Sequence, residues 1–506
     1  MRRLLLFAAA CAATFAAGCA TRGKPSRSAP SRSAPSLDRA AFARAVDSMV
    51  AQPAFRNAHW GIVIVDPQRG DTLYSRNAGK LFMPASNMKL LTGATALAQL
   101  GADFRFRTDF ASNGSLVNGS LRGDLVVVGR GDPTMSDAAF GDAMKPLRAA
   151  ADSLWARGVR EIAGAVVKGG DAFPDSTLGF GWAWDDLDYD YSAGVDELFF
   201  NEGFARVTVH AARTVGGQAT VRTAPARTVP QIGRVAVVTG GMMDPEARQP
   251  NSIAWETDIR GARPSLNLSG FVKMRDSSTV TVAIRNPSQA WLEAFAEALA
   301  DRGIVVRGNV ISTPAADTAG LTHLFTLRSP PLRAILPLLE KPSQNQIAEI
   351  FYRTLGLEKA GAGTPDSGRR VVERQLAAWG ADTAGHAVRD GSGLSRHDYV
   401  TPETVVRVLD AMRRHPDFTA FYGALPIAGV DGTIGARMKG TPAQGNVHAK
   451  TGTVDKARSL SGYVTTADGR MLLFSFLCNN FTVPNSAVEA VQDAMLVRLA
   501  SPLGPR

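Results

Sequence analysis

Hydrophobic residues recur three and four positions apart in two long stretches of the chain, which is the spacing of a buried helix face. The first stretch follows Pro84 and contains Leu90, Leu91, Ala94, Ala96, Leu97 and Leu100. The second stretch contains Ile347, Ile350, Phe351 and Leu355. Both stretches therefore predict helices. Further helices are predicted soon after residue 37 and over residues 290–300 and 487–499.

Short runs of β-branched and aliphatic residues lie between these helices. Near the two ends of the chain they occupy residues 61–65, 72–74, 461–464 and 471–477, and in the middle they occupy residues 124–128, 206–210 and 279–283. The terminal runs predict an antiparallel sheet covered by helices, with a helical subdomain that supplies Ser343. The middle runs predict a β-rich inserted region with one clear helix, at 290–300. The predicted fold class is therefore α+β.

Three short polar motifs lie at or beside predicted helices and strands: Ser86-Asn87-Met88-Lys89, Ser343-Gln344-Asn345 and Lys450-Thr451-Gly452. Residues three apart on a helix share one face, so the Lys89 amine is expected to reach the Ser86 hydroxyl. A serine becomes a strong nucleophile when a base takes its proton, and a lysine acts as that base when burial or a nearby cation lowers its pKa. Lys450 is such a cation if its strand runs beside the helix. Together the motifs predict a serine acyl-transfer enzyme.

Backbone N–H groups at Ser86 and Thr453 are predicted to hold the oxyanion that forms in such a reaction. The set of motifs carries more weight than any one of them. Ser-x-x-Lys and Lys-Thr-Gly each occur once, whereas Ser-x-Asn also begins at Ser75 and Ser265. Ser343 is preferred for its place in the order and for the helix beside it. The alternative is that three unrelated structural residues match the pattern by chance.

The spacing of the motifs predicts how the chain is divided. The gap from Ser86 to Ser343 is more than twice the gap from Ser343 to Lys450, although a compact catalytic domain does not need so long a first gap. We expect a catalytic domain built from residues 37–102 and 319–506. Residues 103–318 are expected to form one or two inserted accessory domains.

In this order the three motifs match those of penicillin-binding proteins and related β-lactamases. Further family-like segments lie at residues 181–186, 390–397, 425–433 and 449–453. With them the chain resembles the D-alanyl-D-alanine carboxypeptidase/endopeptidase family, the class C low-molecular-mass penicillin-binding proteins or serine peptidase family S13. The resemblance implies a penicillin-binding, serine β-lactamase-like transpeptidase domain with a large insertion. It also implies peptidoglycan stem peptides as substrates, β-lactam antibiotics as covalent inhibitors, and neither a cofactor nor a metal.

The resemblance further implies a role for each motif residue. Ser86 is the nucleophile that becomes acylated, Lys89 is its base, and Ser343 relays a proton toward the leaving group. Asn345 hydrogen-bonds the substrate amide. Two other functions remain open: a β-lactamase or esterase that uses the same serine, or an inactive wall-binding scaffold that retains the fold.

Binding roles are implied for a second group of residues. Lys450 and Thr451 recognise the terminal carboxylate of D-alanine, an anion that an ammonium and a hydroxyl suit, and Thr453 supplies an N–H group to the oxyanion. Asp186 and Arg396 contact the diamino acid side chain of a stem peptide. A structural alternative remains for these two residues, because Asp186 lies in an acidic cluster that is also typical of a solvated loop. Arg396 can equally pair with a structural carboxylate.

The first 19 residues are typical of a secretory signal, because arginines precede an apolar run that is too short to span a membrane. The run ends at Cys19, in a context that resembles a bacterial lipoprotein signal. Lipidation of Cys19 is favoured over simple cleavage after Ala20. Residues 20–36 contain a repeated Pro-Ser-Arg-Ser-Ala and are predicted to be a disordered linker. The sequence thus predicts a periplasmic protein, with a lipid anchor as one alternative.

The chain of 506 residues carries a formal charge of +10, which raises the question of nucleic-acid binding. Six basic residues and no acidic residue lie in the first 36 positions, so the remainder is only mildly basic. No zinc-finger spacing, phosphate loop or arginine-rich run favours nucleic acid as a partner. Because Cys11 and Cys19 belong to the leader, Cys478 stands alone in the mature chain. Its apolar strand predicts a buried, inert thiol.

Overall fold

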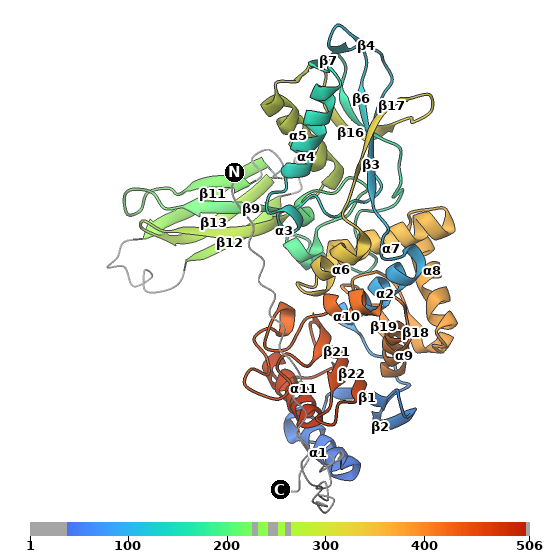
Figure 1. Ribbon diagram of the computed structural model, residues 1–506. Helices are drawn as coiled ribbons and strands as arrows, with labels where there is room; N and C mark the ends of the chain where they lie inside the picture. Colours follow the sequence, from blue (N-terminus) through green and yellow to red (C-terminus); the bar gives the residue numbers. More distant parts are fainter. Residues whose placement is uncertain (1–37, 225–230, 241–250, 259–264, 502–506) are drawn as a thin grey trace, which may run out of the picture.

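The structure, a computed structural model, describes residues 38–224, 231–240, 251–258 and 265–501 (Figure 1). The predicted signal, with Cys19, and the predicted linker lie outside these residues. Within the described ranges, no helix has the length and apolar character needed to cross a membrane. The two ends of the chain meet in one part of the molecule, drawn blue and orange to red, and the middle of the chain forms a second part.

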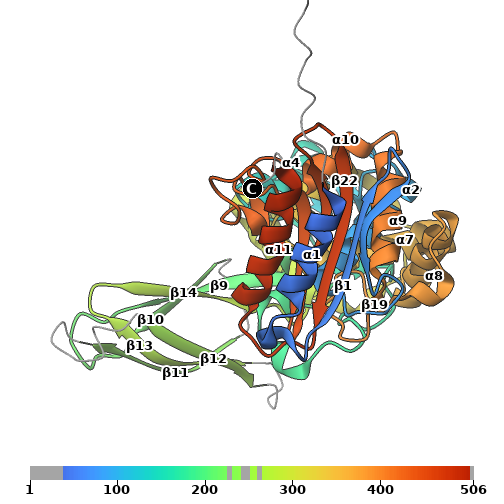
Figure 2. The ribbon, with the colours of Figure 1, turned by 90° about the horizontal axis from the view of Figure 1, so that it is seen from below.

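A five-stranded antiparallel sheet joins the two ends of the chain, in the order β2-β1-β22-β21-β20. It consists of β1 (His59–Asp66), β2 (Asp71–Arg76), β20 (His448–Val454), β21 (Ala457–Thr465) and β22 (Met471–Asn479). Helices α1 (Arg39–Val50) and α11 (Asn485–Ala500) cover one face of it (Figure 2). β22 is central and covered on both faces, so its sequence is apolar at nearly every position instead of alternating.

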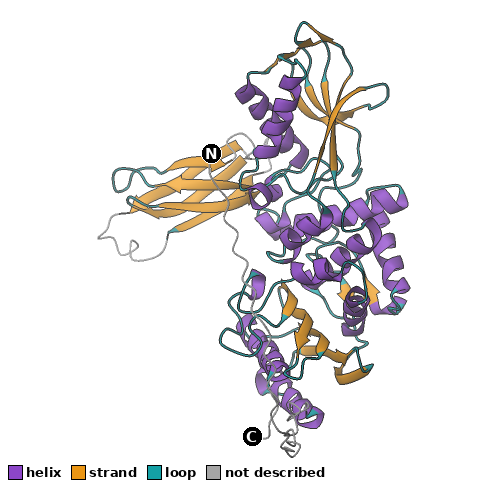
Figure 3. Ribbon diagram, viewed as in Figure 1, coloured by secondary structure: helices purple, strands orange, loops and turns teal. Residues whose placement is uncertain are grey.

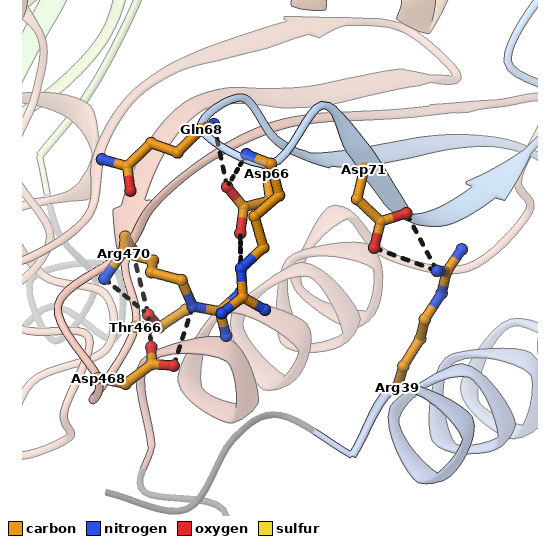
Figure 4. A network of polar contacts seen from close by, with 8 residues as sticks. Arg39, Asp66, Gln68, Asp71, Thr466, Asp468 and Arg470 are labelled. Atoms are coloured by element: carbon orange, nitrogen blue, oxygen red, sulfur yellow. Dashed lines mark hydrogen bonds and ion pairs between the residues drawn. The ribbon is translucent and has the colours of Figure 1, made fainter. Parts of the chain in front are cut away.

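An ion-pair network fastens the N-terminal hairpin to the C-terminal strands (Figure 4). Arg470, in the turn before β22, donates to Asp66 at 2.8 Å across 404 residues of sequence, and it also donates to Asp468 at 2.9 Å. The Asp66 side chain is fully buried, and it accepts further hydrogen bonds from the backbone of the β1–β2 turn. A buried carboxylate with these partners stabilises this pairing of distant segments, because removal of the arginine would leave the charge uncompensated.

A group of helices packs on the opposite face of the sheet. It comprises α2 (Met88–Leu100), α6 (Leu332–Glu340), α7 (Asn345–Ala360), α8 (Pro365–Ala378), α9 (Pro402–Arg413) and α10 (Phe418–Ala424). Their apolar side chains form one continuous core with α2 at its centre. Every residue of α2 from Met88 to Leu97 is buried, so this part of the helix has no solvent-exposed polar face.

The inserted part contains a mixed five-stranded sheet in the order β16-β8-β6-β3-β17. Its strands are β3 (Arg107–Ser112), β6 (Leu125–Val128), β8 (Val166–Gly169), β16 (Val310–Ala316) and β17 (Thr322–Arg328). β17 pairs with β3, so this sheet includes residues beyond position 318. Helices α4 (Lys145–Ala156) and α5 (Pro287–Arg302) share a core with the sheet. The expectation of one clear helix in this region missed α4, whose buried face is half alanine and gives a weak apolar signal.

Two further sheets of the inserted part are three-stranded and face each other around a small apolar core (Figure 3). One has the order β10-β9-β14, from β9 (Phe204–His210), β10 (Thr220–Ala224) and β14 (Ser277–Ala283). The other has the order β11-β13-β12, from β11 (Gln231–Gly240), β12 (Ser252–Asp258) and β13 (Ser265–Lys273). The loop between β8 and β9 connects this sandwich to the rest of the molecule.

Candidate active site

Ser86 lies in a short 3₁₀ turn, η2 (Ala85–Asn87), directly before α2. Strands from the far end of the chain hold this turn. The Ser459 hydroxyl on β21 donates to the Pro84 carbonyl at 2.7 Å, and the Asn87 side-chain amide donates to the Lys450 carbonyl at 2.9 Å. Both bonds are buried, where a hydrogen bond is expensive to break. The position of the Ser86 hydroxyl is therefore fixed relative to β20.

Lys89 lies one helical turn after Ser86 and points at it. Its Nζ lies 3.0 Å from Ser86 Oγ, 2.6 Å from Asn345 Oδ1 and 2.7 Å from the Ser392 carbonyl. The Asn345 amide nitrogen donates to the Tyr191 carbonyl at 2.7 Å, which fixes the orientation of the amide and leaves its oxygen toward the lysine. The predicted contact between Lys89 and Ser86 is thus present.

The same three contacts suit a neutral amine. A neutral lysine has two N–H bonds and one lone pair, and two of its neighbours, the Asn345 oxygen and the Ser392 carbonyl, can only accept. If they take the two N–H bonds, the lone pair faces the Ser86 hydroxyl, which can donate. The geometry is therefore the one that the predicted role of Lys89, as a base toward Ser86, requires.

Burial supports this protonation state. Both lysine side chains of the motifs are fully buried. Desolvation lowers the pKa of Lys89 to about 8, although the carboxylates of Asp390, Glu340, Glu349 and Asp398 oppose the shift. Desolvation, followed by repulsion from Lys89, lowers the pKa of Lys450 to about 7. A substantial fraction of Lys89 is then neutral near neutral or mildly alkaline pH, as general-base catalysis requires.

β20 is the edge strand of its sheet and passes close to Ser86. The Ala449 N–H points to the free edge of this strand, since it donates to the Pro426 carbonyl at 3.0 Å. N–H groups alternate along a strand, so those of Thr451 and Thr453 point to the same edge. An ideal Cβ on Gly452 would lie 2.9 Å from the Ser86 nitrogen, which shows how closely the two segments approach. The Ser86 and Thr453 N–H groups are thus close enough to act together.

We expect Gly452→Ala to lower the acylation rate by about a hundredfold, the usual effect of losing one oxyanion donor. The added methyl group would meet the Pro84 carbonyl oxygen at 2.6 Å, and backbone cannot give way as a side chain can. β20 must then move away from Ser86. The rate of adduct formation with benzylpenicillin measures the effect, with Gly423→Ala, in α10 with open space around it, as the control. An unchanged rate would contradict this account of the oxyanion site.

A cavity of about 740 Å³ opens beside Ser86. Ser343, Asn345, Thr451 and Thr453 line it, as the sequence analysis requires of a substrate site. Ser343 lies in the turn before α7 with a positive φ of 66°, a conformation that is costly for a non-glycine residue and common at functional sites. Its hydroxyl makes no hydrogen bond with the described residues.

Lys450 does not line the cavity as the other motif residues do. Its side chain is fully buried, and Nζ donates to the Thr451 carbonyl at 3.1 Å. The Thr451 hydroxyl donates to Thr433 at 2.7 Å, and both threonines belong to the cavity wall. A carboxylate in the cavity would therefore contact the two threonine hydroxyls directly. The Lys450 charge would act on it from the buried side of these threonines.

Asp186 and Arg396 both line this cavity. Asp186 accepts a hydrogen bond from the Tyr191 hydroxyl at 2.6 Å, whereas Arg396 is exposed. The structure thus brings both residues to the cavity that contains Ser86. Their predicted contact with a substrate side chain stays a prediction.

The inserted sandwich holds the loop that carries Asp186. Asp188 pairs with Arg285 at 2.5 Å and accepts from the Thr257 backbone at 3.1 Å. Asp190 accepts from the Thr281 hydroxyl of β14 at 2.7 Å. Much of the acidic cluster is therefore not a solvated loop, since it attaches the cavity wall to the insertion.

Sequence reasoning missed several residues of the site. Tyr191, Thr433 and Ser392 form hydrogen bonds with motif residues. Tyr191 and Ser392 do so through their backbone carbonyls, and because every residue has a carbonyl, the sequence does not reveal such contacts. Thr433 and Ser392 do lie in family-like segments, at 425–433 and 390–397, which were the available signal. In the part of the chain that the structure describes, no cluster of His, Cys, Asp and Glu is arranged to hold a metal ion.

A family model for the D-Ala-D-Ala carboxypeptidase 3 (S13) family matches residues 42–501 of the chain. The chain belongs to the S13 family. The predicted family and its serine-type D-Ala-D-Ala carboxypeptidase class are thereby confirmed. A D-alanyl-D-alanine carboxypeptidase from Actinomadura sp. (strain R39) is 36% identical over 473 residues, which cover 91% of this chain and 84% of that protein.

Solved structures of another protein share this fold. The crystal structure of penicillin binding protein 4 from Haemophilus influenzae has a TM-score of 0.76 and 25% identity, covering 90% of this chain and 97% of that chain. The same protein complexed with a β-lactam matches with a TM-score of 0.72 and 22% identity, covering 90% and 98%. The predicted α+β fold class is confirmed.

Proposed function

We propose that this S13 protein removes the terminal D-alanine from peptidoglycan stem peptides through an acyl-enzyme on Ser86. The observation that carries the proposal is the set of contacts around Lys89 Nζ, 3.0 Å from Ser86 Oγ with two acceptors on its other sides. The same site would open β-lactams and retain them as an ester. Peptide bonds between cross-linked stem peptides that end in the same D-alanyl linkage would be cleaved in the same way.

In the first half of the reaction, Ser86 Oγ attacks the carbonyl carbon of the penultimate D-alanine while its proton moves to Lys89 Nζ. The carbonyl oxygen becomes an oxyanion that accepts from the Ser86 and Thr453 N–H groups. The C–N bond then breaks, and the leaving amine takes a proton that returns from Lys89 by way of the Ser343 hydroxyl. In the second half, water attacks the ester, gives its proton to Lys89, and Ser86 leaves with a proton restored.

Recognition of the D-alanine carboxylate is assigned to Thr451 and to the charge of Lys450 behind it. The pKa of Lys450, about 7, means that its charge is sensitive to an anion, which would favour the protonated form. Asn345 keeps one N–H for the substrate amide, since its other amide contacts go to Lys89 and Tyr191. This arrangement favours substrates that end in a free carboxylate.

Asp186 and Arg396 are assigned to the side chain of the stem peptide, because a carboxylate and a guanidinium suit an ammonium and a carboxylate of a diamino acid. We expect Asp186→Asn to raise KM about tenfold for a peptide with a free side-chain amine, and to leave kcat nearly unchanged. The same peptide with that amine acetylated is the control, and its KM should not change. Equal effects on both peptides would contradict a direct contact.

The activity is tested by release of the C-terminal alanine from an acylated peptide ending in D-Ala-D-Ala, with the D-Ala-L-Ala peptide as the control. Release from the first peptide alone is expected. No release, with an intact fold, would overturn the proposal. Rapid turnover of benzylpenicillin instead of a persistent adduct would favour the alternative β-lactamase function, and absence of both reactions would favour the scaffold function.

Export of the mature protein to the periplasm and lipidation of Cys19 are part of the same proposal, because peptidoglycan lies outside the inner membrane. A lipid anchor would hold the enzyme near the wall, with residues 20–36 as a spacer. Metabolic fatty-acid labelling with the intact mass of the purified protein tests this: a labelled protein that begins at Cys19 supports it. An unlabelled protein that begins after Ala20 overturns lipidation but not export.

A further inference from the structure

Glu340 is a buried carboxylate that the reaction outlined above does not use. It is the last residue of α6, its exposed fraction is 0%, and neither carboxylate oxygen has a hydrogen-bond partner. Burial of an ionised carboxylate without donors is costly, so such a group is retained only beside compensating charge or as a neutral acid. The charges around Glu340 therefore decide what it does.

The carboxylate lies against the face of α2 that carries Lys89. An ideal Cβ on Gly93 would lie 2.8 Å from Glu340 Oε1, and Gly93 follows Lys89 by four residues, which places both on one side of the helix. The other atoms closest to that position belong to Leu336 and Leu339, at 3.6 Å. Glu340 thus occupies an apolar recess below Lys89 that exists because residue 93 has no side chain.

Two buried lysines lie within electrostatic range of Glu340. Glu340 interacts electrostatically with both Lys89 and Lys450. Asp390, Glu349 and Asp398 also act on Lys89, and Arg458 acts on Lys450. Those three acids have backbone donors of their own around the 390–398 loop, whereas Glu340 has none. Glu340 is therefore an acid that interacts with both lysines. Among its described neighbours, only these two lysines balance its negative charge.

We propose that Glu340 is a positioning residue that acts through Lys89 and Lys450: its buried carboxylate keeps one positive charge on the lysine pair and stabilises the charge that appears on Lys89 when Ser86 gives up its proton. The inference rests on the proposed function. In the form that reacts, Lys89 is neutral and the positive charge resides on Lys450; this is the less populated of the two singly protonated forms, because the pKa of Lys450 lies below that of Lys89. During attack the proton from Ser86 arrives at Lys89, and Glu340 offsets the second cation at the moment when repulsion between the lysines is largest.

The test is the pH dependence of acylation by benzylpenicillin in Glu340→Gln, a change that keeps the shape and removes the charge. Without the carboxylate, the ammonium form of Lys89 loses a stabilising neighbour and its pKa falls. The acid limb of the profile should then move to lower pH by about one unit, the size expected for one nearby opposite charge. The plateau rate should fall about tenfold, because Lys89 becomes a weaker base.

Glu358→Gln is the matched control, since Glu358 is a partly exposed glutamate that pairs with Arg130 away from both lysines. Its profile should coincide with that of the parent. Gly93→Ala is a second test that keeps the charge but moves it, because the new methyl group would overlap Glu340 Oε1. Alanine is also the better helix former, so α2 itself is not weakened. Gly93→Ala is expected to shift the acid limb in the same direction.

A Glu340→Gln profile that coincides with the parent profile overturns the inference, because a purely structural role does not set the acid limb. If Glu340→Gln fails to fold, Gly93→Ala decides: a shifted acid limb supports the inference, and an unshifted limb overturns it. A parent protein that forms no adduct with benzylpenicillin refutes the proposed function, and the inference fails with it. If the parent forms the adduct with a normal pH profile and the profile of Glu340→Gln is not shifted, only the role of Glu340 is refuted and the proposed function stands.

Discussion

Ser86→Ala is expected to form no adduct with benzylpenicillin and to release D-alanine at least about 10⁴-fold more slowly than the parent, as for other serine nucleophiles. The change removes Oγ, the atom that attacks, and leaves the backbone N–H and the contacts that fix the turn. Ser459 and Asn87 still hold that turn through bonds to backbone carbonyls. The fold and the cavity should therefore survive while covalent chemistry is lost.

Intact-mass spectrometry after incubation with benzylpenicillin gives the answer directly. Ser343→Ala serves as the comparison, because it removes a hydroxyl from the same cavity without removing the nucleophile. This variant should still form the adduct, but more slowly. An adduct that persists in Ser86→Ala would place the nucleophile elsewhere and would contradict the whole scheme.

Lys89→Met is expected to slow acylation by about 10³-fold, within the range of a lost general base. Methionine fills nearly the same volume as lysine but cannot take the Ser86 proton. The acid limb of the pH profile should disappear in this variant, because the group that titrates near pH 8 is gone. In the parent, activity should rise with pH through that value, since only the neutral amine accepts a proton.

Stability provides a separate readout of Lys89→Met. The substitution leaves the Asn345 oxygen and the Ser392 carbonyl without their donor, which costs about 1–3 kcal/mol for each buried acceptor. Removal of a buried amine offsets part of this cost. Thermal unfolding, with Lys456→Met as an exposed control, separates a loss of catalysis from a loss of fold. A variant that unfolds at the parent temperature yet keeps the parent acylation rate would contradict the base assignment.

The sequence was sufficient for those parts of the site that depend on local spacing. Ser86 and Lys89 are three residues apart on a helical segment, so their contact follows from helix geometry alone. The helix that begins at Asn345 was visible from its apolar period, and β22 was visible as an apolar run. The order of the three motifs also predicted that Lys450 lies near Ser86. The structure places it there because the sheet pairs the two ends of the chain.

Residues whose surroundings come from distant segments could not be predicted in this way. Glu340 ends an apolar helix and is followed by Lys341, a pattern that indicates an exposed helix end, yet it is fully buried against α2. Lys450 was expected in the cavity lining but lies behind it, because alternation along β20 turns its side chain into the interior. Such positions depend on packing between helices and sheet, which no local pattern records.

The order of strands in the sheet has a consequence for when the enzyme becomes active. β1, made early in synthesis, has its central partner in β22, made almost last, and Ser86 is held by residues of β20 and β21. A nascent chain that lacks its last strands therefore cannot bring Ser86, the lysine pair and the β20 backbone together. Closing this long loop adds little entropy cost beyond that of a shorter one, since the cost rises only with the logarithm of length. An enzyme that cuts the cell wall thus stays harmless until its whole chain has emerged.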